Sequence, residues 1–205
     1  MNACKYISCQ IISFLPKRVF EGIVKRHEGD KWVKHFTCRN QLFLMIFGQV
    51  VGCSRLREVV AIIYAIKSKN SHLGFGSYDI KLRNLSYANS NRDYKIFEEF
   101  AYHMINLAQR KRITKPFVLN GKFYAFDSTT IDLYMSMFEW AYFRKTKGGI
   151  NVQTLFDVVT QIPTEIYITE AKRNDVNAMD EIPYESNTFY IFDKGYYGLA
   201  RLYRI

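Results

Sequence analysis

Two short runs of the sequence carry an aspartate at the same place. "FYAFD" ends at Asp127 and "FYIFD" ends at Asp193, so each carboxylate directly follows an apolar, aromatic run typical of a β-strand. A carboxylate at the tip of a buried strand loses solvation energy unless something binds it. If the two strands are neighbours in one sheet, the carboxylates lie about 4.8 Å apart. Two anions at that distance repel each other unless a cation lies between them.

A divalent metal ion is the cation that such a pair favours. Mg²⁺ prefers hard oxygen ligands and is commonly held by one or two carboxylates together with substrate phosphates. Two such ions, about 3.5 to 4 Å apart, activate a water or a hydroxyl group and stabilise the leaving oxygen in phosphoryl transfer. The pattern therefore predicts that Asp127 and Asp193 hold Mg²⁺ or Mn²⁺. The alternative is that each forms only a local turn, because "DST" and "DKG" are good turn sequences.

The cysteine and histidine residues do not indicate a zinc site. No C-x-x-C pair is present, and the histidines show no ligand spacing with the cysteines. We interpret the cysteines as reduced thiols, buried or at the surface; they are Cys4, Cys9, Cys38 and Cys53.

A basic segment precedes the second predicted strand. "FRKTKGG" places Arg144, Lys145 and Lys147 beside two glycines. Glycines allow a backbone to approach closely, and the cations match phosphate groups. The three cations are therefore candidates for contacts with phosphate groups. An ordinary solvated basic loop is the alternative.

The net charge of the 205-residue chain, +10, is unevenly distributed. Residues 1–120 contain 20 Lys and Arg against 8 Asp and Glu, whereas residues 121–205 contain 9 against 11. This division indicates a polyanion-binding region joined to a module with another task, and the alternative is a basic surface that serves only solubility. No apolar run reaches the roughly 18 residues of a membrane span, and the start lacks the pattern of a secretory signal. We expect a cytoplasmic protein without membrane association.

The pattern of apolar residues in the sequence changes near residue 113. Before it, apolar residues follow the helix period, with Ser54 as an expected N-cap, and predict helices over 42–52, 54–67 and 91–112 with a short helix between the last two. After it, β-branched and aromatic residues predict strands over 122–127, 150–160, 164–170 and 187–193, with a short helix near "DVNAMDEI". We therefore predict an α+β (or α/β) protein, with a helical region at 1–112 and a mixed sheet within 113–205.

Several motifs together resemble a known family. "FDSTTIDL", "FRKTKGGINVQTLFDVVTQIPTEIYITEAKRND" and "FYIFDKGYYG" resemble DDE transposases of bacterial insertion sequences, in the insertion-sequence-four group. "SRLREVV" and "LSYANSNRDYKIFEEF" resemble the amino-terminal DNA-binding region of that family. The resemblance covers most of residues 40–205. It implies a ribonuclease-H-like sheet with catalytic, metal-binding aspartates on its first and fourth strands, which here are Asp127 and Asp193.

The resemblance also implies a function. The family binds double-stranded transposon-end DNA and catalyses metal-dependent hydrolysis and strand transfer with two Mg²⁺ or Mn²⁺ ions, which implies association with the nucleoid. Its third acid is a Glu within a Tyr…Arg…Glu signature after the second Asp, and the 12 residues that follow Asp193 contain no counterpart. We therefore expect the 205-residue polypeptide to be a fragment, poorly stable and inactive by itself, with an incomplete sheet.

Two other functions stay open at this point. A catalytically inactive DNA-binding module would compete with an intact transposase for DNA ends. A metal-dependent nuclease of another group would be completed by a partner chain. A homo-oligomer on DNA is open in each case.

Overall fold

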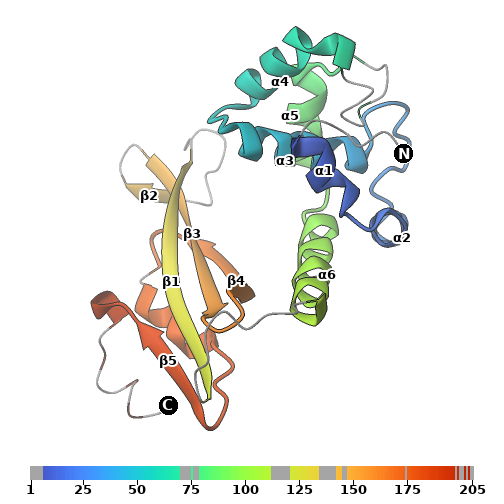
Figure 1. Cartoon of the computed structure of the whole chain (residues 1–205). Coiled ribbons are helices and arrows are strands. Elements are labelled where there is room, and N and C mark those ends of the chain that lie inside the picture. The colour runs from blue at the N-terminus through green and yellow to red at the C-terminus, as the bar shows by residue number, and fades with distance from the viewer. Residues whose placement is uncertain are drawn as a thin grey trace. The chain divides into compact units, whose positions relative to one another are not determined.

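The computed structural model describes residues 7–69, 75, 79–111, 121–133, 142–144, 147–173, 175–196, 198, 201 and 203. The chain divides into two compact units, Met1–Met104 and Ile105–Ile205, drawn in Figure 1. The first is helical and the second contains a mixed sheet, so the predicted α+β fold with an amino-terminal helical region is confirmed. Within the described residues, no helix has both the length and the apolar character needed to cross a membrane.

The helical unit is built around α3. Its elements are α1 (Ile7–Ser13), α2 (Lys17–Arg26), α3 (Cys38–Val51), α4 (Leu56–Ala65), the 3-10 turn η1 (Lys67–Lys69), α5 (Leu82–Asn91) and α6 (Lys95–Lys111), which continues into the second unit. α3 contacts α1, α2, α4 and α5. It is apolar on most sides, as expected for a helix surrounded by others.

Two groups of buried side chains hold these helices together. One joins α3, α4 and α5 through Leu44, Ile63 and Leu85. The other joins α2 to α6, where the Phe20 and Phe100 rings meet edge to face with centroids 4.9 Å apart. Cys38 belongs to the second group, and its burial raises the pKa of the thiol to about 12, so that it stays protonated.

The N-terminal cap of α4 differs from the predicted one. Ser54 is not its N-cap; the N-cap is Arg55. The carboxylate of Glu58 accepts hydrogen bonds from the backbone N–H groups of Ser54 and Arg55, at 2.9 and 3.3 Å. A Glu at the third helical position thus reaches back to the N-cap backbone N–H, as in the second half of a capping box.

A buried arginine connects three parts of the helical unit. Arg92, between α5 and α6, has a side chain only 9% exposed. It donates to the Phe36 carbonyl and to Gln41 Oε1 (2.8 Å), and it forms an ion pair with Asp30 at 3.6 Å. Gln41 in turn donates to Asn89 Oδ1 at 2.6 Å. The network fixes the loop before α3 against α3 and the α5–α6 junction.

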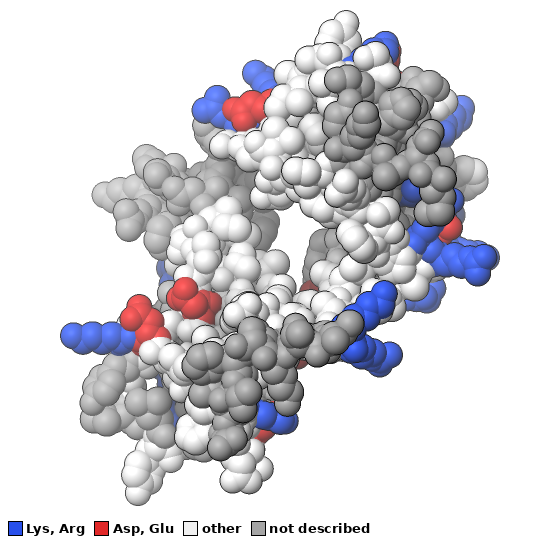
Figure 2. Space-filling model, viewed as in Figure 1, with Lys and Arg blue, Asp and Glu red and all other residues white. Residues whose placement is uncertain are grey.

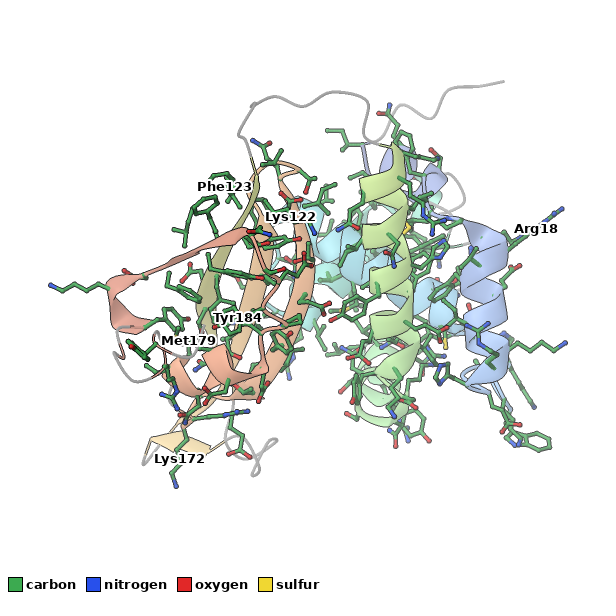
Figure 3. All side chains as sticks on the ribbon, turned by 90° about the horizontal axis from the view of Figure 1, so that it is seen from below. Arg18, Lys122, Phe123, Lys172, Met179 and Tyr184 are labelled. Carbon is green, nitrogen blue, oxygen red and sulfur yellow. The ribbon has the colours of Figure 1, made fainter. Side chains whose placement is uncertain are left out.

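Replacement of Arg92 by alanine should destabilise the helical unit by about 1 to 3 kcal/mol, because the Phe36 carbonyl and Gln41 Oε1 each lose a hydrogen bond and Asp30 loses its ion pair. The matched control is Arg18→Ala, since the Arg18 side chain extends from α2 into solvent (Figure 3). The control should stay within about 0.5 kcal/mol of the parent. Urea unfolding of the full chain, followed by helical circular dichroism, measures both. Equal losses in the two variants would contradict the structural role of Arg92.

The second unit is a five-stranded mixed sheet. Its strands are β1 (Lys122–Leu133), β2 (Tyr142–Arg144), β3 (Lys147–Asp157), β4 (Ile162–Glu170) and β5 (Thr188–Phe192), with 3-10 turns η3 (Asp175–Glu181) and η4 (Lys194–Tyr196). β1 lies between β5 and β3, and β3 also pairs with β2 and β4. The β1–β5 pair is parallel and the other pairs are antiparallel. The four predicted strands are thus confirmed, with shifted ends.

The two faces of the sheet differ. On one face, Phe126 and Leu155 are buried under η3, whose Met179 is also buried (Figure 3). On the other face, apolar side chains are about half exposed; these are Ile131, Ile168, Phe189 and Ile191. Residues alternate between the faces of a strand, so Asp127, next to Phe126, lies on the second face.

Candidate metal centre

The parallel pairing of β1 and β5 brings two identical patterns side by side. The register matches Phe123 with Phe189, Tyr124 with Tyr190, Ala125 with Ile191 and Phe126 with Phe192. The rings of the three aromatic pairs lie 4.7, 5.6 and 6.1 Å apart. Each aromatic residue therefore packs against a residue of its own kind.

Asp127 and Asp193 are the next residues along these two strands. Each directly follows the last paired residue, Phe126 or Phe192, and adjacent strands lie about 4.8 Å apart. The structure thus places both aspartates at one point of the sheet, as a shared metal ion requires. Acidic side chains are visible at the surface where β5 ends (Figure 2).

Two expectations about these aspartates are wrong. β1 does not end at Asp127 but continues to Leu133, because Thr129, Thr130 and Ile131 favour a strand and pair with β3. Asp127 and Asp193 are also both exposed, so neither carboxylate loses its hydration by burial. The adjacency of the two acids, which follows from the register of β1 with β5, is the part of the argument that stands.

The carboxylates are oriented by the backbone. Asp127 Oδ1 accepts a hydrogen bond from the N–H of Ser128 at 2.8 Å, and Asp193 Oδ1 accepts one from the N–H of Lys194 at 2.6 Å. Local hydrogen bonds of the kind expected for turns are therefore present at both sites. Toward the part of the chain that the structure describes, neither Oδ2 atom forms a hydrogen bond or an ion pair, so each carboxylate offers one oxygen to a ligand.

The donor set fits a hard divalent cation that is shared with other oxygen ligands. No group of three or more His, Cys, Asp or Glu side chains suited to a metal ion occurs among the described residues. Two carboxylates alone leave most positions of an Mg²⁺ ion to water or to substrate oxygens, which is how this ion is usually bound.

The sequence analysis missed a residue that positions Asp193. Tyr196 in η4 is 5% exposed and its ring packs on Phe126 and Phe192, with centroids 5.4 and 6.2 Å away. Its backbone N–H donates to the Asp193 carbonyl at 3.0 Å. The signal that could have identified it is the aromatic residue three positions after the aspartate in "DKGYYG".

The basic candidates lie at a hairpin rather than in a plain loop. The backbones of Arg144 and Lys147 pair with each other where β2 turns into β3. Lys147 opens β3, which therefore begins before the expected residue 150. Lys145 lies outside the described residues. The structure thus places two of the three predicted cations by their backbone only.

Comparison with known proteins concerns mainly the helical unit. Residues 3–76 match the model of a family described as a domain of unknown function, DUF4372, which is found in transposase-like proteins. No curated protein and no solved structure matches the chain. The match covers α1 to α4 and does not include either aspartate.

Tyr196→Ala should destabilise the sheet unit by about 3 kcal/mol, because it removes a buried ring from between Phe126 and Phe192. Gly195→Ala is the matched control in the same turn, since a Cβ at Gly195 meets no atom within 4 Å. The control should be as stable as the parent, or up to about 1 kcal/mol more stable. Thermal unfolding followed by aromatic circular dichroism distinguishes the two. A stable Tyr196→Ala variant would show that η4 does not anchor the end of β5.

Proposed function

We propose that the protein is a DDE transposase of the insertion-sequence-four group, which binds transposon-end DNA and carries out metal-dependent phosphodiester hydrolysis and strand transfer. The observation that carries the proposal is the placement of Asp127 and Asp193 at neighbouring positions of two parallel strands. Neither the aromatic repeat nor the fold requires an acid at both positions.

The order of the strands supports this proposal. β1, β3 and β4 form an antiparallel set, and β5, the fourth long strand, lies parallel to β1. The family resemblance implies the same arrangement for a ribonuclease-H-like sheet, with acids on the first and fourth strands. The DUF4372 match adds independent support, because that domain occurs in transposase-like proteins.

Asp127 and Asp193 would hold the metal ions in this activity. Bound Mg²⁺ or Mn²⁺ supplies an activated water or hydroxyl group and neutralises charge on the reacting phosphate. The chain contributes the orientation of the carboxylates, through the N–H groups of Ser128 and Lys194. Arg144, Lys145 and Lys147 are proposed to contact DNA phosphates. The third acid implied by the resemblance has no assigned position in residues 1–205.

Metal binding tests the site directly. The full chain should bind Mn²⁺ saturably, as followed by electron paramagnetic resonance, and Asp127→Asn and Asp193→Asn should each abolish saturable binding. The matched control is Asp180→Asn, which removes the same charge from an exposed acid of the same unit that pairs with Arg201 at 3.2 Å. Undiminished Mn²⁺ binding by the double variant at positions 127 and 193 would exclude the shared site.

DNA binding tests the other half of the proposal. The full chain should bind duplex DNA with an affinity that falls steeply as salt rises, because Lys and Arg side chains displace counterions from phosphates. With six to ten phosphate contacts, the loss between about 50 and 200 mM salt is on the order of 10³ to 10⁵. Fluorescence anisotropy of a labelled duplex measures the slope. Binding that does not depend on salt, or no binding at about 50 mM, would contradict the electrostatic argument.

A further inference from the structure

The loop between α2 and α3, residues 27–37, displays a tryptophan. The side chain of Trp32 is 91% exposed, more than any other large hydrophobic side chain described in the helical unit. Tryptophan is highly buried on average, so a nearly complete exposure is unusual. The position of Trp32 therefore calls for an explanation other than packing within the chain.

The backbone of the same loop is strained. Trp32 has φ of 62° and Glu28 has φ of 50°, both in the left-handed region that favours glycine. Such conformations are costly for residues with side chains and persist only where the surrounding structure fixes them. Two turn hydrogen bonds enclose the strained residues, from Lys31 N–H to Glu28 O at 2.9 Å and from Val33 N–H to Asp30 O at 3.1 Å.

The loop is held firmly just before the tryptophan. Gly29 packs so closely that a Cβ there would lie 2.4 Å from Ile96 Cδ1 and 2.8 Å from Cys38 Sγ. Asp30 Oδ1 accepts a hydrogen bond from the Cys38 N–H at 2.7 Å, and the same carboxylate pairs with buried Arg92. The core thus fixes the backbone at Gly29 and Asp30, just before Trp32.

The surroundings of Trp32 are polar, with an excess of cations along the chain and an ion pair between Lys31 and Glu28 at 2.6 Å. Lys31 and Lys34 flank it, and residues 17–39 contain seven Lys and Arg against three Asp and Glu. Lys25, Lys31 and Arg39 line a groove of about 610 Å³ beside the loop, together with Glu21, Glu28 and Asp30. Figure 2 shows Lys and Arg side chains projecting from the surface where α2 lies in Figure 1.

We infer that Trp32 stacks on an unpaired base at an end of the DNA that the helical unit binds, while Lys34 contacts a neighbouring phosphate. The inference rests on the proposed function for the presence of DNA. An exposed aromatic ring between cations is the combination by which proteins hold bases and backbone together. A rigid loop lowers the free energy needed to order the ring on binding. Along the chain, Lys31 precedes Trp32, and Val33, Lys34 and His35 follow it, so cations lie on both sides of the ring in the sequence.

The fluorescence of Trp32 reports stacking directly. The chain contains two tryptophans, and Trp140→Phe leaves Trp32 as the one indole. A short DNA duplex with an unpaired base at one end should quench its emission saturably, because a stacked base quenches indole. Heparin, a polyanion without bases, should bind the same cations without comparable quenching. Equal quenching by the two polyanions would overturn the stacking.

Affinity supplies the second measurement, made with the full chain at fixed salt. Trp32→Ala should weaken binding of the duplex with the unpaired base roughly 5- to 100-fold, the range found for loss of one stack on an unpaired base. Trp32→Phe should retain most of the affinity. Lys34→Ala should reduce the slope of log affinity against log salt by about one, whereas Trp32→Ala should leave that slope unchanged.

The control is Tyr87→Ala, which removes another exposed aromatic side chain, on α5, and should leave the affinity unchanged. If the parent binds the duplex and Trp32→Ala binds it equally well, the role of Trp32 is overturned while DNA binding stands. If the parent does not bind duplex DNA, both the proposed function and this inference fail.

Discussion

The parallel pairing of β1 with β5 is the interaction on which the candidate site depends. Its register is fixed by like residues that face each other, Phe123 on Phe189 and Phe126 on Phe192 among them. A slip by one residue would turn every side chain of β5 to the opposite face and expose Phe192. A slip by two would keep the faces but move Asp193 about 6.6 Å along the strand, away from Asp127. The aromatic repeat therefore sets the register, and the register aligns the two acids.

The exposure of the two aspartates explains how the sheet tolerates them. Hydrated carboxylates repel each other far less than buried ones, because water screens their charges. The two acids can thus lie side by side without a bound cation. An open position also suits a large anionic substrate, whose phosphate oxygens would complete the coordination that two carboxylates leave unfilled. Arg92 shows the opposite arrangement, a buried charge whose partners come entirely from the chain.

The sequence predicts those features that depend on local patterns. β-Branched and aromatic residues located the strands, and the repeat of Phe, Tyr and Asp marked the two strands whose pairing would bring the acids together. The length of β1 was missed because "DST" favours a turn, whereas pairing with β3 extends the strand across it. The roles of Arg92 and Tyr196 were missed for another reason. Arg92 reaches residues 51 and 56 positions away, and no local pattern records such contacts. The left-handed backbone conformation of Trp32 could not be predicted from the sequence either, because glycine is the residue type that indicates this conformation.

The Arg92 network illustrates how stability and conformation can be separated. A buried ion pair often contributes no more stability than apolar side chains of the same size, because its desolvation offsets its attraction. The network nevertheless selects one arrangement: Asp30 must receive both Cys38 N–H and Arg92, and this fixes the loop that begins at residue 27. Apolar replacements could retain the packing while releasing the strain at Glu28 and Trp32. The chain instead keeps a polar anchor beneath a strained, exposed ring. The network thus maintains the conformation of the loop rather than adding stability to it.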